Sequence, residues 1–155
     1  MTTQAKICGI NTPETMMAAV KHGAAHIGLV FFPKSPRAVT PAEAAMLAAR
    51  VPAQVNTVGL FVNPEDALID QVLEAVPLDI IQLHGSESPE RCAAIKARTG
   101  RQVMKALPVR EAGDLIPAAD YDKVCDWLLF DAKAPEGADP PGGNATAFDW
   151  QPLTG

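Results

Sequence analysis

The side chains of this sequence that could do chemistry fall at or near the ends of short apolar runs. A thiol, Cys8, lies near the end of the run "KICGI", and a carboxyl, Asp131, directly follows the apolar residues "LLF". Basic, amide and imidazole side chains occupy comparable places: Lys6, Lys34, Arg37, Asn63, Gln82, His84 and Lys105. A thiol and a carboxyl beside groups that bind anions suit proton transfer on an anionic substrate.

Each of these residues also has an ordinary structural interpretation. Cys8 is typical of a small core residue, because free cysteine is among the most buried residue types. Most of the others fit roles as solvated charges, helix caps or satisfied polar groups: Lys6, Arg37, Asn63, Gln82, His84 and Lys105. Asp131 is the hardest to explain in this way, since a carboxylate that closes a buried strand costs free energy unless it is paired or used.

Six apolar runs supply the elements that must position these side chains. They are nearly continuous in apolar character rather than alternating, which is typical of parallel strands buried on both faces. They read "KICGI", "HIGLVFF", "NTVGLFV", "DIIQLH", "QVMKAL" and "DWLLFDA". Parallel α/β folds place their active sites at the carboxyl ends of such strands, where the reactive side chains fall here.

Helix starts separate the runs and share one pattern, a capping residue followed by Pro and an acid. The pattern predicts helices that begin at Thr12, Thr40, Asn63 and Ser88, spaced by about 25 residues, the length of one strand–helix unit. Gly23 and Gly100 fall where a left-handed helix end is expected. The segment 108–121 predicts a poorer, short helix. The chain therefore reads as five strand–helix units and a sixth strand.

Two folds accept such a repeat, a doubly wound sheet and a (β/α)8 barrel. A dinucleotide site in the first fold would need G-x-G-x-x-G after the first strand, and "CGINTPET" does not offer it. A barrel needs eight strands, and counting alone leaves the choice open. No shift in composition divides the 155 residues, so we expect a single domain over residues 1–155.

Composition excludes several classes of partner. The formal net charge is -5 and no basic run occurs, so we expect no nucleic-acid partner. No apolar stretch is long enough to cross a bilayer and no secretory signal is visible, so we expect no membrane partner and a cytoplasmic location. The sequence has three cysteines, and an odd number argues against a disulfide framework. The spacing of the cysteines and histidines does not predict a metal site; these residues are Cys8, Cys92, Cys125, His22, His26 and His84.

Several segments in order resemble the phosphoribosylanthranilate isomerases, (β/α)8 enzymes of tryptophan biosynthesis. They are "KICGI", "GLVFFPKSPRAVTP", "VGLFVN", "IQLHG", "VMKAL", "LLFDAK" and "GG-x4-FDW". The resemblance covers essentially the whole chain. It implies a cofactor-free and metal-free Amadori rearrangement of N-(5-phosphoribosyl)anthranilate, a small phosphosugar, to 1-(2-carboxyphenylamino)-1-deoxyribulose 5-phosphate.

The resemblance also implies roles for individual residues. Asp131 matches the general acid, which protonates the furanose ring oxygen, and Cys8 matches the general base, which removes the proton from C2 of the sugar. Arg37 matches the arginine that holds the anthranilate carboxylate. Gln82 and His84 match the signature of the fourth strand and are expected to line the substrate pocket. An acid and a base that act together predict a bell-shaped pH profile.

Related chains continue for two more strand–helix units, which commonly bind the phosphate in such barrels. We therefore expect an incomplete barrel with about its first six strands, from a C-terminally truncated chain or fragment. We expect a monomer or a homodimer, and we expect the isolated chain to be poorly stable, or to dimerise, and to show little activity. The alternative is an inactive remnant, or a half that needs a partner. Another phosphosugar barrel would have Asp or Lys in place of Cys8, so the thiol argues against it.

The segment 133–148 is long enough to suggest a functional loop. Ala145 stands there where related sequences often have glycine, so a positive φ at that position would be strained.

Overall fold

The computed structural model describes residues 3–133 and 151, so the expected loop over 133–148, with Ala145, lies outside the described residues except for Lys133. Strands and helices alternate along the chain, and the expected order of five strand–helix units and a sixth strand is confirmed. The strands are β1 (Lys6–Cys8), β2 (His26–Val30), β3 (Asn56–Phe61), β4 (Ile80–Leu83), β5 (Gln102–Val109) and β6 (Trp127–Ala132). The helices are α1 (Pro13–Lys21), α2 (Pro41–Ala48), α3 (Asp66–Ala75), α4 (Pro89–Thr99), the 3-10 helix η1 (Ala112–Leu115) and α5 (Ala118–Asp122).

The strands follow the chain order β1 to β6 in a single sheet. The pairs β1–β2, β2–β3 and β5–β6 are parallel, as the nearly continuous apolar runs predict. The chain divides into two compact units, residues 1–81 and residues 82–155, and the division falls inside β4.

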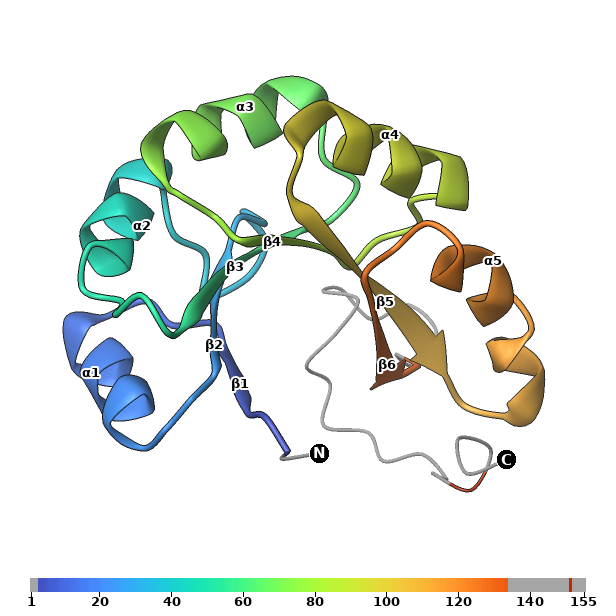
Figure 1. Cartoon of the computed structure of the whole chain (residues 1–155), viewed down its shortest axis with the longest axis horizontal. Coiled ribbons are helices and arrows are strands. Elements are labelled where there is room, and N and C mark those ends of the chain that lie inside the picture. Colours follow the sequence, from blue (N-terminus) through green and yellow to red (C-terminus); the bar gives the residue numbers. More distant parts are fainter. Residues whose placement is uncertain (1–2, 134–150, 152–155) are drawn as a thin grey trace. The chain divides into compact units, whose positions relative to one another are not determined.

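In the first unit the helices α1, α2 and α3 lie together on one side of their strands (Figure 1). All five residues of β2 are buried, and the fully buried side chains nearby include Met16 from α1 and Ile69 and Val72 from α3. Ile69 and Val72 of α3 thus face the core. The rings of Phe31 and Phe61 stack with centroids 5.2 Å apart.

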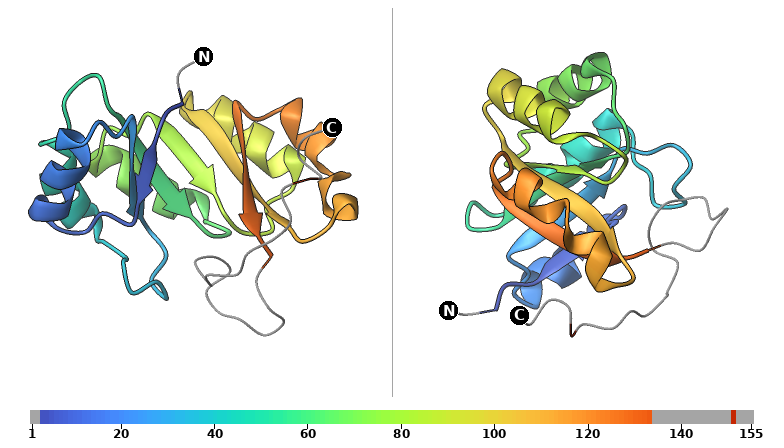
Figure 2. Two further views of the ribbon diagram at one scale, coloured as in Figure 1. Left: turned by 90° about the horizontal axis from the view of Figure 1, so that it is seen from below. Right: turned by 90° about the vertical axis from the view of Figure 1, so that its right-hand side faces the viewer.

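In the second unit β5 and β6 run side by side, with α4 and α5 on one side of them (Figure 2). The core under these helices contains Cys92 and Ile95 from α4 and Val103 and Val109 from β5, all fully buried. The poor helix predicted after β5 is short, as expected, because η1 and α5 have four and five residues.

Three of the four predicted helix caps are confirmed. The side chains of Thr12, Thr40 and Ser88 each accept a hydrogen bond from the third residue of the helix, and Pro opens each helix. The prediction for Asn63 is wrong, because α3 begins at Asp66 after Glu65. Asn63 has a φ of 46°, and a capping residue needs the extended backbone that this left-handed conformation excludes.

One contact recurs at the start of a strand in each unit. In the first unit a carboxylate oxygen of Asp79 accepts the N–H of Thr57 at 2.7 Å, just before β4. In the second unit Asp126 accepts the N–H of Val103 at 2.9 Å, just before β6. Each aspartate also donates its own N–H to the carbonyl of the same partner. The two bonds therefore fix the start of β4 against β3 in the first unit, and the start of β6 against β5 in the second.

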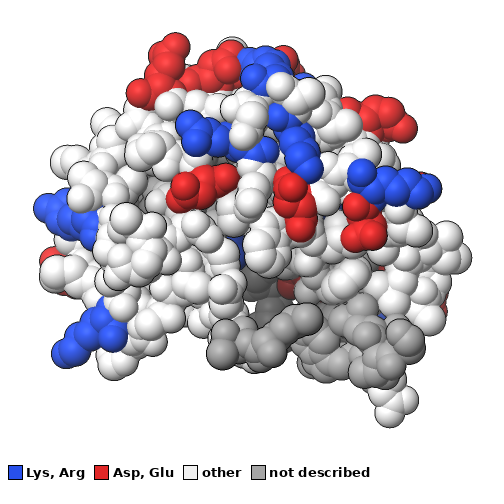
Figure 3. Space-filling model, in the orientation of Figure 1, with Lys and Arg blue, Asp and Glu red and all other residues white. Residues whose placement is uncertain are grey.

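The surface drawn in Figure 3 mixes acidic and basic side chains, and no broad basic patch covers its described residues. Among the described residues no helix has the length and apolar character that a membrane span requires. Both observations concern only the part of the chain that is described.

Candidate active site

The thiol of Cys8 stands at the carboxyl end of β1, where the residue is half-buried. Its strand neighbour in the parallel pair is Gly28 of β2. A Cβ atom added at Gly28 would come within 2.9 Å of the Cys8 Sγ atom, closer than such contacts occur. The absence of a side chain at Gly28 therefore makes the space in which the thiol lies.

Arg37 reaches the same place from the loop that follows β2. Its Nη1 donates a hydrogen bond to the carbonyl oxygen of Cys8 at 3.1 Å. The guanidinium passes close over Gly9, where an added Cβ would lie 2.7 Å from the Arg37 Cδ atom. Gly9 also has a φ of 81°, which favours glycine, so both space and backbone explain the residue that follows the thiol.

Asp131 lies near the carboxyl end of β6 and pairs with Pro108 of β5 in the strand register. Its Oδ2 atom is 3.2 Å from Nε2 of His84, and its Oδ1 atom accepts the N–H of Ala132 at 2.9 Å. The side chains of His84 and Asp131 are 17% and 35% exposed, so the pair is shielded and still within reach of a small molecule. This geometry satisfies the carboxylate that the sequence leaves without a partner.

Gln82 contacts the second ring nitrogen of His84. Its Nε2 lies 3.1 Å from Nδ1 of His84, and with the amide nitrogen as donor, Nδ1 is the acceptor and Nε2 carries the proton offered to Asp131. Gln82 is 1% exposed, and its Oε1 is buried without a hydrogen-bond partner among residues 3–133 and 151. Turning the amide would bring Oε1 toward Nδ1, so Gln82 can serve a neutral or a protonated imidazole.

The electrostatics of the pair favour the carboxylate. The hydrogen bond from His84 is the largest effect on Asp131, and with the N–H of Ala132 it outweighs burial and lowers the pKa of Asp131 below its ordinary value. The imidazole and the carboxyl share one hydrogen bond, so a change in one side chain acts directly on the other.

The five expected site residues thus form two groups, each inside one unit. Cys8 and Arg37 lie together in the first unit, and Gln82, His84 and Asp131 form a hydrogen-bonded chain in the second. No group of three or more His, Cys, Asp or Glu side chains in residues 3–133 and 151 is placed to hold a metal ion.

Sequence reasoning missed two residues that shape these groups. Gly28 is hidden inside an apolar run, and only the pairing of β1 with β2 places it against the thiol. Glu87 reads as a loop acid, but it is buried and bound to Lys105. Lys105 itself is therefore not a side chain that extends to solvent, one of its expected interpretations.

Parallel strands that alternate with helices and carry reactive groups at their carboxyl ends define an enzyme of the α/β barrel and sheet class. The family model for N-(5'-phosphoribosyl)anthranilate (PRA) isomerase matches residues 5–155 of the chain. The isomerase of Rhodospirillum centenum is 56% identical over 156 residues, which cover 100% of this chain and 73% of the relative. That of Paracoccus denitrificans is 57% identical and is covered to 72%.

Solved structures agree. A phosphoribosyl anthranilate isomerase from Thermotoga maritima superposes with a TM-score of 0.84 at 38% identity, covering 96% of this chain and 69% of that one. Another such isomerase, in complex with reduced 1-(o-carboxyphenylamino)-1-deoxyribulose 5-phosphate, matches with a TM-score of 0.78 at 37% identity, over 84% of this chain and 66% of that one.

The chain therefore belongs to the PRA isomerase family. Its fold is that of the (β/α)8 barrel, of which the described residues contain six strands. Its function is PRA isomerase activity in tryptophan biosynthesis, and its substrate is a small phosphosugar.

Proposed function

We propose that Asp131 and Cys8 are the catalytic acid and base of the isomerisation. Asp131 gives a proton to the furanose ring oxygen while the C1–O bond breaks, and the nitrogen lone pair forms the C=N bond of an iminium ion. Cys8, as the thiolate, then takes the proton from C2, and the electrons of that bond move to the iminium. The resulting enolamine tautomerises to 1-(2-carboxyphenylamino)-1-deoxyribulose 5-phosphate.

The observation that carries this proposal is the hydrogen bond between His84 and Asp131. An acid must hold a proton, yet the imidazole lowers the pKa of Asp131. The 3.2 Å contact with the imidazole is a path along which a proton can reach Asp131.

The substrate's two charged ends call for different partners. Arg37 is exposed beside the thiol, and its planar guanidinium suits a carboxylate, so we assign it to the anthranilate group. The isomerase solved in complex with reduced 1-(o-carboxyphenylamino)-1-deoxyribulose 5-phosphate supports a ligand of this chemistry. In the second unit we assign His84 to the lining of the substrate pocket, and Gln82 acts there through its contact with His84, because its own side chain is almost completely buried.

We further propose that residues 1–155 belong to one domain, which the division of the two units inside β4 supports. Either a monomer or a homodimer is compatible with the family, since the Thermotoga maritima isomerase is described both as dimeric and as derived monomers. The three free thiols, Cys8, Cys92 and Cys125, support a cytoplasmic location.

Complementation tests the assignment. In a tryptophan auxotroph that lacks the isomerase, whatever growth this chain restores should be lost with Cys8→Ala or Asp131→Asn at equal protein levels. Growth with either variant would contradict its catalytic role. The matched control is Cys125→Ala, which removes a thiol outside the proposed site and should support growth.

A further inference from the structure

A buried ion pair lies beside the loop that carries His84. Nζ of Lys105 is 2.9 Å from Oε2 of Glu87, and each side chain is 2% exposed. Burying two charges is costly, and apolar residues of similar size often stabilise a fold as well or better. Stability alone therefore does not explain the pair, and its surroundings indicate what else it does.

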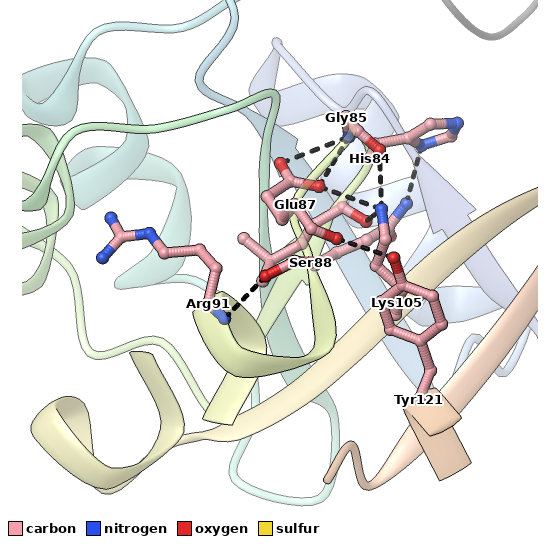
Figure 4. Close-up of polar contacts among 9 residues, drawn as sticks. His84, Gly85, Glu87, Ser88, Arg91, Lys105 and Tyr121 are labelled. Carbon is pink, nitrogen blue, oxygen red and sulfur yellow. Dashed lines mark hydrogen bonds and ion pairs between the residues drawn. The ribbon is translucent and has the colours of Figure 1, made fainter. Parts of the chain in front are cut away.

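The ammonium of Lys105 binds the backbone on both sides of His84. Nζ donates to the carbonyl oxygen of Gly85 at 2.7 Å and to that of Leu83 at 3.4 Å (Figure 4). The carboxylate of Glu87 closes the loop, because its two oxygens accept the N–H of Gly85 at 3.2 and 3.0 Å. Both members of the ion pair, Lys105 and Glu87, are therefore hydrogen-bonded to the backbone next to His84.

Tyr121 adds a third hold on this loop. Its hydroxyl donates to the carbonyl oxygen of Glu87 at 2.9 Å, and its ring lies 5.8 Å from Nζ of Lys105. Burial and the nearby Cys92 and Glu87 raise the pKa of Tyr121, so the hydroxyl keeps the proton that it donates. Figure 4 shows the ring beside the lysine, with the hydroxyl directed at the loop.

The strand order relates these contacts to the His84–Asp131 pair. His84 follows β4 and Asp131 lies in β6, so β5 stands between the strands that bring them. Lys105 belongs to β5 and pairs with Leu128 of β6, and Pro108 three residues later pairs with Asp131. The strand that holds the His84 loop through Lys105 is therefore also the strand that sets the place of Asp131.

We propose that Lys105 and Glu87 are positioning residues that hold the His84 loop on β5, so that the imidazole meets the Asp131 carboxylate. Tyr121 supports them. The consequence for turnover rests on the proposed function, in which the His84–Asp131 pair supplies the proton. The placement of the imidazole is a separate statement, and it can be measured without substrate.

The decisive variant is the double substitution Lys105→Met with Glu87→Gln. Lys105→Met alone would leave a carboxylate buried and unpaired, which is strongly destabilising, whereas the double variant removes both charges. We expect it to fold, with kcat reduced about 10- to 100-fold and KM little changed, as for the loss of a group that orients a catalytic one. The ring nitrogen NMR signals of His84 should shift as its bond to Asp131 weakens.

Lys96→Met is the matched control. Lys96 also pairs with a carboxylate of the second unit, Asp126, at 2.8 Å, but that pair holds the start of β6 and does not contact the His84 loop. Its loss should leave kcat, KM and the His84 signals as in the wild type. This control separates a general effect of losing a lysine ion pair from an effect on the loop.

A folded double variant with wild-type kcat and unchanged His84 signals would overturn the inference. If the double variant does not fold, Tyr121→Phe decides, because it removes only the hydroxyl bond to Glu87; unchanged His84 signals in that variant would overturn the inference equally. Wild-type turnover in Asp131→Asn would instead refute the proposed function, while the His84 signals would still decide whether the ion pair positions the imidazole.

Discussion

Nε2 of His84 lies 3.2 Å from Oδ2 of Asp131, although the two residues are 47 positions apart in the chain. The contact connects the end of β4 with β6 through a hydrogen bond between an imidazole and a carboxyl. It satisfies a carboxylate that closes an apolar strand.

The variant His84→Gln tests the contact between His84 and Asp131 directly. The hydrogen bond from His84 is the main cause that lowers the pKa of Asp131, so its loss should raise that pKa toward the ordinary value. NMR titration of the Asp131 carboxyl carbon measures the change. We also expect kcat to fall by about 10-fold or more, because the carboxyl loses the imidazole that is hydrogen-bonded to it. An Asp131 pKa that does not rise would show that the imidazole does not stabilise the carboxylate.

Gly28→Ala should disturb the thiol without touching the substrate. The new Cβ would lie 2.9 Å from Cys8 Sγ, so the thiol must move. We expect kcat to fall about 10- to 100-fold, with a cost of about 1–3 kcal/mol in the free energy of unfolding for the added atom. Gly113→Ala is the control, because nothing lies within 4 Å of a Cβ at that position. Turnover in Gly28→Ala equal to the control would contradict the proposed place of the base.

Stability should depend on pH through His26. This residue is 6% exposed, its ring contacts Gln4 at 3.2 Å and Asn56 at 3.3 Å, and burial followed by the charge of Lys6 lowers its pKa below 6.5. The unfolded chain therefore binds the proton first as pH falls. The contribution is full above about pH 6.5 and is lost as pH falls toward the lowered folded-state pKa.

Urea unfolding between pH 5 and 8 measures this effect, with His26→Gln as the comparison. The wild type should lose more stability than the variant below about pH 6.5, since the variant has no imidazole to protonate at that position. Identical slopes in the two proteins would show that His26 does not carry the effect.

The elements were predictable because local chemistry determines them. Pro after Thr12, Thr40 and Ser88 sets the first helical residue, and the hydroxyl caps a free N–H, so these three starts agree with the structure. Asn63 has the same pattern, but the helix start predicted there is wrong because its backbone is left-handed. Side-chain patterns do not report that conformation.

The site was predictable in its members and only partly in its contacts. Cys8 and Asp131 could be found because strand ends bring reactive groups to one edge. The hydrogen bond from His84 to Asp131 depends on the loop after β4, which a buried lysine on β5 holds in place. The fit of Gly28 under the thiol depends on strand register. Neither relationship leaves a signal in local sequence.

If Cys8 and Asp131 transfer the protons of the isomerisation, kcat should fall in Cys8→Ala and in Asp131→Asn, measured on protein whose circular dichroism matches the wild type. Each variant should lose about 100-fold or more of kcat, and the wild-type rate should show a bell-shaped pH dependence. A kcat within about threefold of the wild type in either folded variant would contradict these roles.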